Sequence, residues 1–496
     1  MKNQVQLIAY TDRLGGTLPG LRDLLEGPFA GLFGGVHLLP FFDPIDGADA
    51  GFDPIDHTRV DERLGSWDDI AALARESDVM ADVIVNHISR RSPQFVDYLA
   101  QGDRSEYAGM FLTVDSVFPE GATEADLLAI YRPRPGLPFT PIELADGTTR
   151  EFWTTFTADQ IDIDVTHPLG RAYLENVLRA FTENGISMIR LDAVGYAIKR
   201  AGTSCFMTDE TFDFIGRFGE IAGRYRLEVL IEVHSHFRRQ VEIARHVSWV
   251  YDFALPPLVL HAFFNQTSRY LKQWIRLRPT NAVTVLDTHD GIGVIDIGAA
   301  ADGDSTGLVP DDELSRLVDR IHSNSKGESQ AATGTAADNL DVYQVNCTFY
   351  DALARDDLSY LLCRAIQFFL PGVPQVYYVG LLAGTNDMEL LAKTQVGRDI
   401  NRHYYTRAEV DLDLRRPVVV RLFELIRLRN THPAFGGEFE IAESADDAID
   451  VRWRDAGEFA RLHVDFKTLS HRLEYSANGR TARLALHASF SRTGGR

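Results

Sequence analysis

The sequence is poor in cysteine and contains no long hydrophobic run. Its 496 residues include 3 cysteines, Cys205, Cys347 and Cys363, and no Cys-x-x-Cys pair. A chain of this length needs no disulfide scaffold, so we expect buried, reduced thiols. No apolar segment approaches the roughly 18 residues of a membrane helix, and Met1–Leu7 is typical of a strand rather than of a signal peptide. We therefore expect a cytoplasmic protein that does not enter a membrane.

Positive charge is also scarce. The chain has 50 Lys and Arg residues against 71 Asp and Glu residues, which gives a net charge of −21. A surface this acidic repels nucleic acid and anionic membranes, so the sequence predicts neither as a partner. It repels phosphate as well, and any local cluster of arginines therefore requires an explanation. The proportions of hydrophobic residues (45%) and charged residues (24%) are typical of a globular protein and exclude a disordered chain.

The sequence does contain a regular alternation of strand-like and helix-like segments. Eight short apolar segments of strand type are separated by segments of helical periodicity, such as Gly170–Gly185. This alternation predicts a (β/α)8 TIM barrel. A doubly wound sheet explains the count less well, and no glycine-rich phosphate loop follows any strand. The predicted strands are Val5–Tyr10, Gly35–Phe42, Met80–His87, Ile186–Tyr196, Glu228–Ser235, Ser248–Leu255, Ala282–Asp290 and Pro374–Gly380.

Two long stretches interrupt the alternation, and insertions of this size belong in the βα loops where barrel enzymes build active sites. The first contains a basic, proline-rich segment, Tyr131–Phe139, and the second a Gly/Ser/Thr/Ala-rich run, Ser323–Asn339, that we expect to be a mobile loop. Alternating runs after His432 predict a small C-terminal antiparallel β domain. The predicted division is barrel at 1–87, 166–291 and 356–432, an inserted domain at 88–165, an inserted loop region at 292–355, and the β domain at 433–496.

Carboxylates gather where the predicted strands end, on the face where barrel enzymes place their active sites. The fourth strand carries Arg190 and Asp192, the fifth carries Glu232, and the seventh ends in Asp290. One such residue alone is usually a capping or solvated carboxylate, but three at one barrel mouth favour a catalytic role. Paired carboxylates suit glycosidic bond cleavage, in which one attacks the anomeric carbon and the other protonates the leaving oxygen. We expect Arg190 to keep the neighbouring Asp192 ionised.

Several blocks of the sequence are similar to those of a known family. Asp82–His87, Gly185–Tyr196, Glu228–Ser235 and Val283–Asp290 resemble the four conserved regions of the α-amylase superfamily of retaining glycoside enzymes. A more specific similarity, along essentially the whole chain, is to the sucrose phosphorylases within that superfamily. The strings that carry it are Phe41–Pro44, Asp46–Pro54, Val60–Trp67, Tyr131–Phe139, Thr288–Gly293 and Gly397–Tyr405.

The resemblance implies a retaining transfer of glucose from sucrose to inorganic phosphate, which gives α-glucose 1-phosphate and fructose. Asp192 would be the nucleophile that forms a β-glucosyl-enzyme. Glu232 would be the general acid and then the base that activates phosphate, and Asp290 would stabilise the transition state. Arg190 would orient Asp192.

The resemblance also implies a set of residues that bind the glucose ring. Asp49 and Arg398 would hold the far end of the ring, and His87 and His289 would bond its other hydroxyls. Phe52 would offer an apolar face to the ring.

The acceptor side would be formed by the two inserted loops. Arg134 and the segment Asp341, Val342, Tyr343 and Gln344 match loop residues that bind fructose or phosphate in alternating arrangements. A guanidinium fork suits phosphate, and a chain this acidic needs a local cation for an anionic acceptor. The alternatives are a solvated surface loop for Arg134 and ordinary loop packing for Tyr343.

Some positions depart from the wider superfamily. Thr288 stands where starch-acting members usually carry Asn, and Gly195 stands where amylases usually carry a basic residue. Both departures argue against a long glucan as substrate. Asn86 matches a calcium ligand of amylases, but phosphorylases of this kind do without the ion, so we expect neither metal nor cofactor. The resemblance favours a homodimer.

Three rival functions remain at this level. A sibling phosphorylase acting on glucosylglycerol, glucosylglycerate or sucrose 6'-phosphate would keep the donor site and differ in the acceptor loops. A sucrose hydrolase or isomerase is a weaker alternative. A catalytically dead barrel used as a binding subunit would lack one of the three carboxylates, and all three are present.

Overall fold

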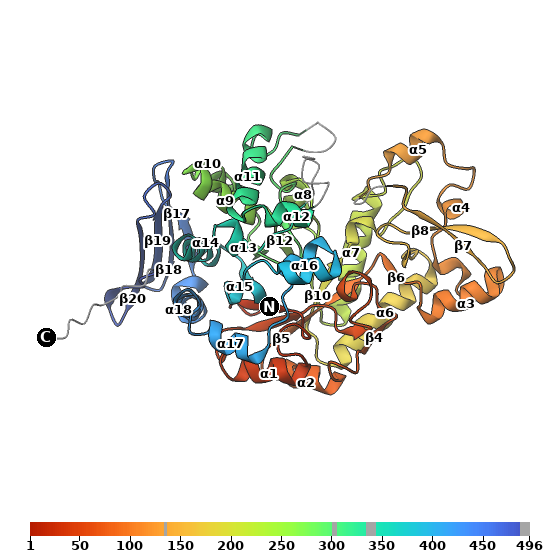
Figure 1. Ribbon diagram of the computed structural model, residues 1–496, viewed down its shortest axis with the longest axis horizontal. Helices are drawn as coiled ribbons and strands as arrows, with labels where there is room; N and C mark the ends of the chain where they lie inside the picture. Colours follow the sequence, from red (N-terminus) through yellow and green to blue (C-terminus); the bar gives the residue numbers. More distant parts are fainter. Residues whose placement is uncertain (133–135, 300–304, 334–343, 487–496) are drawn as a thin grey trace.

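The computed structural model describes residues 1–132, 136–299, 305–333 and 344–486 of the chain. In this part of the chain, eight parallel strands close into a barrel in the order β1-β16-β13-β12-β11-β10-β5-β2, which confirms the predicted fold. The barrel lies in the middle of the molecule (Figure 1). Its strands are β1 (Gln6–Ala9), β2 (Gly35–Leu38), β5 (Asp78–Ile84), β10 (Met188–Asp192), β11 (Glu228–Ile231), β12 (Trp249–Asp252), β13 (Ala282–Thr284) and β16 (Val373–Tyr377).

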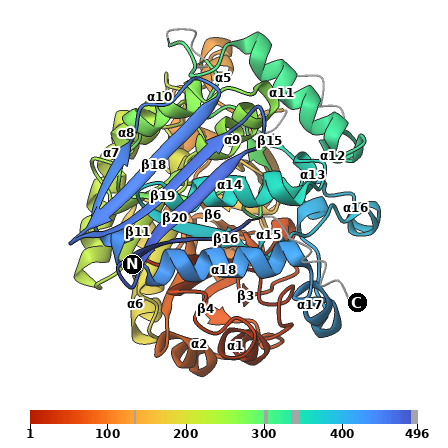
Figure 2. The same cartoon turned by 90° about the vertical axis from the view of Figure 1, so that its left-hand side faces the viewer.

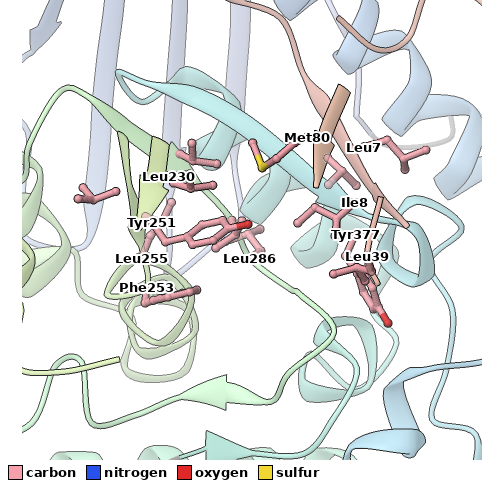
Figure 3. Close-up of a cluster of buried hydrophobic side chains, with 14 of the residues drawn as sticks. Leu7, Ile8, Leu39, Met80, Leu230, Tyr251, Phe253, Leu255, Leu286 and Tyr377 are labelled. Atoms are coloured by element: carbon pink, nitrogen blue, oxygen red, sulfur yellow. The ribbon is translucent and has the colours of Figure 1, made fainter. Parts of the chain in front are cut away.

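The barrel strands are apolar because side chains fill the inside of the barrel and helices cover its outside. Figure 3 shows part of this core, in which Met80, Leu230 and Tyr251 come from β5, β11 and β12. The observed strands stop earlier than predicted. The seventh was predicted to reach Asp290, but β13 ends at Thr284. The residues that follow leave the sheet and carry polar side chains to the barrel mouth.

Helix α6 (Pro168–Glu183) illustrates how the outer layer is specified. Pro168 occupies its first turn, and the His167 side chain accepts a hydrogen bond from the backbone of Leu169. Its buried face consists of Gly170, Leu174, Val177, Leu178 and Phe181. The other helices outside the two insertions are α1 (Leu18–Glu26), α2 (Trp67–Ala74), α7 (Asp209–Arg224), α8 (Phe237–Ile243), α9 (Leu255–Asn265), α10 (Arg269–Leu277), α14 (Asp357–Phe369), α15 (Tyr378–Leu381), α16 (Met388–Thr394), α17 (Arg407–Asp413) and α18 (Pro417–Thr431).

The first insertion follows β5 and extends away from the barrel, on the right in Figure 1. It contains two antiparallel pairs, β6 with β9 and β7 with β8. A small second core, which includes Leu112, Phe118 and Trp153, holds it together. Its elements are β6 (His87–Ser89), α3 (Pro93–Gln101), α4 (Val114–Val117), α5 (Glu124–Ala129), β7 (Phe139–Glu143), β8 (Thr149–Trp153) and β9 (Gln160–Asp162).

The second insertion follows β13 and contradicts one prediction. The run Ser323–Asn339 was expected to be a mobile loop, but α12 (Glu328–Thr333) lies within it, and residues 334–339 lie outside the described residues. Its small residues allow close packing: Ser329 and Ala332 are buried, and the Ser329 hydroxyl lies 2.7 Å from Nδ1 of His322. The insertion also contains β14 (Ile292–Gly293), α11 (Asp311–Asn324), β15 (Gln344–Val345) and α13 (Phe349–Ala352). The domain boundaries stay a prediction.

A five-stranded antiparallel sheet forms the C-terminal part of the described chain. Its position after His432 matches the prediction of a small C-terminal β domain, although its first strand, β17, has only Phe439 and Ile441 as apolar residues. The sheet packs on α14 (Figure 2), where the Trp453 indole donates a hydrogen bond to the carbonyl of Phe369 at 2.7 Å. The strands are β17 (Glu438–Ile441), β18 (Ala448–Asp455), β19 (Glu458–Asp465), β20 (His471–Ala477) and β21 (Arg480–Arg483).

Two further expectations concern the whole chain. Cys205, Cys347 and Cys363 are buried and unpaired, which confirms the prediction of buried thiols. None of the helices within the described ranges combines the length and the apolar character needed to cross a membrane.

Candidate active site

The three carboxylates singled out from the sequence meet at the C-terminal ends of the barrel strands. Asp192 is the last residue of β10, and Glu232 directly follows the neighbouring strand β11. Arg190 joins them: its Nη1 lies 3.0 Å from Oδ1 of Asp192, and its Nη2 lies 3.4 Å from Oε1 of Glu232. Side-chain oxygens of Glu232 and Asp290 lie within 4.8 Å of each other and of a His234 ring nitrogen.

The chain turns sharply after Asp192. Ala193 adopts a left-handed backbone conformation, with φ 54° and ψ 21°, which residues other than glycine adopt with difficulty. The turn directs the backbone amide of Ala193 to Oε2 of Glu232 at 3.4 Å. Strain of this kind is typical of functional sites, and here it couples the backbone of one strand end to the carboxylate of the next.

A buried acid that sequence reasoning did not single out lies behind Arg190. Nη1 of Arg190 donates a hydrogen bond to Oδ1 of Asp82 at 2.5 Å, and Oδ2 of Asp82 lies 3.1 Å from Nε2 of His37. Burial opposes ionisation of Asp82, but the charges of His37 and Arg190 outweigh it and lower its pKa to about 2. The residue opens the block Asp82–His87, so its position offered a signal, although its partner could not be read from the sequence.

The guanidinium of Arg190 contacts three carboxylates, those of Asp82, Asp192 and Glu232. Burial raises the pKa of Asp192 well above its ordinary value, although Arg190 opposes the rise. The negative charges of Glu232, Asp82 and Asp290 reinforce it. Arg190 thus favours the ionised form of Asp192, in the predicted direction, but burial and the neighbouring acids act against it more strongly in the site without substrate.

Asp290 has the opposite surroundings. Its Oδ1 lies 2.9 Å from Nη1 of Arg398, which is on a short 3-10 helix at Gly397–Asn401, and 3.9 Å from Nη2 of Arg402. Burial opposes ionisation, but the charges of Arg398 and Arg402 hold the pKa of Asp290 well below its ordinary value. Arg402 was not named as a site residue, although it stands in the string Gly397–Tyr405. Asp290 is therefore an anion in the resting site.

Aromatic rings and imidazoles complete the donor side. The ring of Phe52 stacks on His289 with centroids 5.1 Å apart and an angle of 10° between the planes. Burial lowers the pKa of His289 to about 3, so its ring is neutral near pH 7. Nε2 of His87 lies 2.9 Å from the carbonyl oxygen of Phe52 and 3.1 Å from Nε2 of Gln160, a residue that sequence reasoning missed. Asp49 lies in the 3-10 helix Ala48–Gly51, but its side chain is not among those described.

The predicted acceptor residues are only partly described. Arg134, Asp341 and Tyr343 lie outside the described residues. Gln344 is the first described residue after the gap and is buried. Its Oε1 accepts a hydrogen bond from the backbone of Gly291 at 3.0 Å, and its Nε2 lies 3.1 Å from Nε2 of His234.

The residue that matches an amylase calcium ligand is bonded to an ammonium group. Nζ of Lys199 lies 2.8 Å from Oδ1 of Asn86 and 2.8 Å from Oδ2 of Asp162. Lys199 therefore joins the barrel to the first insertion with a protein cation. Glu232, His234 and Asp290 also have the spacing of a metal site. However, the guanidinium of Arg190 already contacts Glu232, and that of Arg398 contacts Asp290.

Comparisons with known proteins agree with this geometry. The model of the alpha-amylase catalytic domain matches residues 16–419. A sucrose phosphorylase of Agrobacterium vitis is 59% identical over 94% of this chain and 96% of its own length. Another, of Bifidobacterium adolescentis, is 58% identical over 94% of this chain and 92% of its own. Among solved structures, a sucrose 6F-phosphate phosphorylase of Thermoanaerobacter thermosaccharolyticum has a TM-score of 0.91 and 40% identity, with 97% of each chain covered.

Proposed function

The chain belongs to the alpha-amylase family and, within it, to the sucrose phosphorylase group of glycosyl-transferring enzymes; from this premise we propose that it cleaves sucrose with inorganic phosphate. The products would be α-glucose 1-phosphate and fructose. The observation that carries this proposal is the 59% identity to a sucrose phosphorylase over 94% of the chain. The arrangement of Asp192, Glu232 and Asp290 around Arg190 supports it, because it brings together the groups that a retaining transfer requires.

The first step of the proposed mechanism forms a covalent intermediate. A carboxylate oxygen of Asp192 attacks the anomeric carbon of the glucosyl unit, and the bond from that carbon to the fructose oxygen breaks. Glu232 gives its proton to this leaving oxygen. In this step Asp192 attacks as the anion and Glu232 acts as the acid. Asp290, which remains ionised beside Arg398, stabilises the positive charge that develops on the ring.

The second step reverses these roles with a different acceptor. A phosphate oxygen attacks the anomeric carbon from the side that fructose has left, and the ester bond to Asp192 breaks. Glu232, now a carboxylate, accepts the proton from the attacking phosphate hydroxyl. Two inversions give overall retention, so the glucose 1-phosphate has the α configuration.

The remaining site residues have roles in binding. Phe52, His87 and His289 would line the glucose ring, with Arg398 and Asp49 at its far end. Arg134, Asp341, Tyr343 and Gln344 would bind fructose and phosphate in turn. These roles are consistent with neutral His289 stacked on Phe52, which offers a flat, uncharged surface.

We further propose a cytoplasmic homodimer that needs no metal and no cofactor, with inorganic phosphate as a substrate. The buried, unpaired cysteines suit a reducing compartment. Lys199, which bonds Asn86 and Asp162, already supplies a cation at the position where amylases would place calcium. Size-exclusion chromatography with light scattering tests the dimer.

The function is tested by incubating the protein with sucrose, with and without inorganic phosphate, and measuring glucose 1-phosphate and free glucose. We expect glucose 1-phosphate as the main product when phosphate is present. Free glucose as the main product, at a rate that phosphate does not change, would contradict a phosphorylase.

The second candidate is a sibling phosphorylase, which the TM-score of 0.91 to a sucrose 6F-phosphate phosphorylase favours. The same assay with sucrose 6'-phosphate, glucosylglycerol and glucosylglycerate decides between them. We expect kcat/KM to be highest for sucrose. A higher value for one of the other donors would assign the enzyme to that donor.

A further inference from the structure

A chain of buried polar groups lies behind Glu232 and leads into the second insertion. Oδ2 of Asp296 lies 3.0 Å from Nδ1 of His234, and Nε2 of His234 lies 3.1 Å from Nε2 of Gln344. The same Nε2 lies 3.8 Å from Oε1 of Glu232. Asp296 is 0% exposed and His234 is 3% exposed, so their mutual contacts are shielded from water. None of the roles given above uses Asp296.

The surroundings of Asp296 hold it in one orientation. Its Oδ1 accepts hydrogen bonds from Nε2 of Gln240 at 2.7 Å and from the backbone of Ser235 at 3.2 Å. Gly293 makes room for it, since a Cβ atom at that position would lie 2.4 Å from Oδ2 of Asp296. The ring of Phe253 stacks on His234 with centroids 3.8 Å apart. Both carboxylate oxygens are thus assigned: one to Gln240 and Ser235, the other to His234.

This assignment fixes which nitrogen of His234 carries a proton. Asp296 is an acceptor, so Nδ1 of His234 donates to it in both charge states of the ring. In the neutral ring Nε2 is then an acceptor, and the side-chain amide of Gln344 can donate to it. The charged groups that face His234 are Asp296, Glu232 and Asp290. The bond between His234 and Gln344 therefore depends on Asp296, although Asp296 touches neither Gln344 nor the reacting atoms.

We propose that Asp296 is a positioning residue that, through His234, holds Gln344 against the catalytic carboxylates and so organises the acceptor side of the site. Gln344 directly follows the segment with the predicted acceptor residues Asp341 and Tyr343. The Asp296–His234 contact would thus set how fructose and phosphate are placed, whereas the glucose side rests on other residues. This inference depends on the proposed function, because it assigns a part of the same glucosyl transfer.

The test compares two donors in the variant Asp296→Asn. Gln240 and Ser235 both donate to the same oxygen, so Asn places its carbonyl there and turns its NH2 group toward Nδ1 of His234. The imidazole must then carry its proton on Nε2. This proton faces the NH2 group of Gln344, so the hydrogen bond between Gln344 and His234 is lost. We expect kcat/KM for sucrose to fall about tenfold and the ratio of free glucose to glucose 1-phosphate to rise. With α-glucosyl fluoride, which has no fructose, glucosylation should fall much less.

Two other variants keep the result unambiguous. Gln240→Met removes one hydrogen-bond donor to Asp296 but leaves the carboxylate, so we expect the same two changes at about a third of the size. Asp450→Asn makes the same chemical change at a buried aspartate of the C-terminal sheet. It should leave the rates with sucrose and with α-glucosyl fluoride, and the product ratio, unchanged. If Asp296→Asn does not fold, Gln240→Met decides the question.

Equal losses for sucrose and α-glucosyl fluoride would overturn the inference, because Asp296 would then support the fold or Glu232 in general. Unchanged kinetics in folded Asp296→Asn, or in folded Gln240→Met when Asp296→Asn does not fold, would overturn it as well. The proposed function fails by a different result: wild-type protein that forms no glucose 1-phosphate from sucrose and phosphate.

Discussion

The two sides of the active site bury carboxylates to a similar depth but neutralise them differently. On one side, the single guanidinium of Arg190 faces Asp82, Asp192 and Glu232. On the other side, Asp290 faces two guanidinium groups, those of Arg398 and Arg402. Burial raises the pKa of Asp192 while cations lower that of Asp290, although their side chains are 14% and 8% exposed. Nearby cations outweigh burial at Asp290 but not at Asp192.

This difference suits the chemistry proposed for each side. A general acid can give its proton to the leaving oxygen and later, as a carboxylate, take one back from phosphate. A carboxylate that stays ionised can stabilise positive charge throughout both steps. Asp192 and Glu232 thus have one proposed role and Asp290 another. This difference follows from the positions of the three arginines, Arg190, Arg398 and Arg402.

The largest expected effect comes from removing the nucleophile on the crowded side. Asp192→Asn keeps the shape of the side chain but cannot form the glucosyl ester, so turnover of sucrose should fall by at least about 10⁴-fold. Initial rates of glucose 1-phosphate formation measure this, and Asp450→Asn is the matched control. Retention of a tenth of the activity would show that another group is the nucleophile.

A smaller effect concerns the acceptor phosphate, which this crowded side repels. If Arg134 supplies the missing cation, Arg134→Ala should raise the KM for phosphate about tenfold, raise that for sucrose much less, and increase the proportion of free glucose. Steady-state kinetics with each substrate varied in turn measures both constants. Arg132→Ala is the matched control, because its Nη1 is bonded to the carbonyl of Gly136 and its side chain is exposed. Unchanged phosphate dependence in Arg134→Ala would place the phosphate elsewhere.

The barrel and the meeting of three carboxylates at its mouth could be predicted from the sequence because both leave local signals. A strand buried on two faces is a continuous apolar run, and a residue such as Asp192 stands out inside it. The predicted strands nevertheless ran too long. Beyond Thr284 the apolar residues Val285 and Leu286 continue the pattern after the backbone has left the sheet.

The contacts that set the electrostatics of the site could not be predicted. Asp82 contacts Arg190 because β5 and β10 are adjacent and in register, with Arg190 opposite Asp82. The local sequence of a strand specifies neither its neighbour nor its register. Asp296 contacts His234, which lies 62 residues earlier in the chain. Asp296 itself lies in an insertion whose sequence has no periodic pattern. The helix α12 was missed for the opposite reason, since small residues that suggest a loop allow close packing when a neighbour such as His322 is present.

The acid behind Arg190 provides a test of how the crowding acts. Asp82→Asn removes one negative charge near Asp192 and frees Arg190 for its other partners, so the pKa of Asp192 should move down toward its ordinary value. The acid side of the pH profile of kcat/KM should then shift to lower pH, so that activity at pH 5 relative to pH 7 rises about twofold or more. An unchanged profile would mean that Asp82 acts only through packing, and Asp450→Asn again serves as the control.

The smallest expected effect is on stability, and it has opposite signs on the two sides. The ionised form of Asp192 is disfavoured in the folded protein, so stability is present below its ordinary pKa of 3.8 and is lost as pH rises through the raised value. Asp192→Asn fixes the neutral form and should raise Tm at pH 7 by about 1–2 °C. Asp290 contributes stability above pH 3.8 that is lost as pH falls toward its lowered pKa. Asp290→Asn removes the negative charge that contacts Arg398 and Arg402, so Tm at pH 7 should fall by about 2–4 °C.

Melting curves at pH 4 and pH 7 separate these two cases. The gain of Asp192→Asn should shrink at pH 4, because the wild-type carboxyl is then protonated as well. The loss of Asp290→Asn should persist at pH 4 and diminish only below it, because Asp290 stays ionised down to its lowered pKa. Shifts of the same sign for both substitutions at pH 7 would mean that burial alone governs these carboxyls, and that the cations around them do not decide their charge.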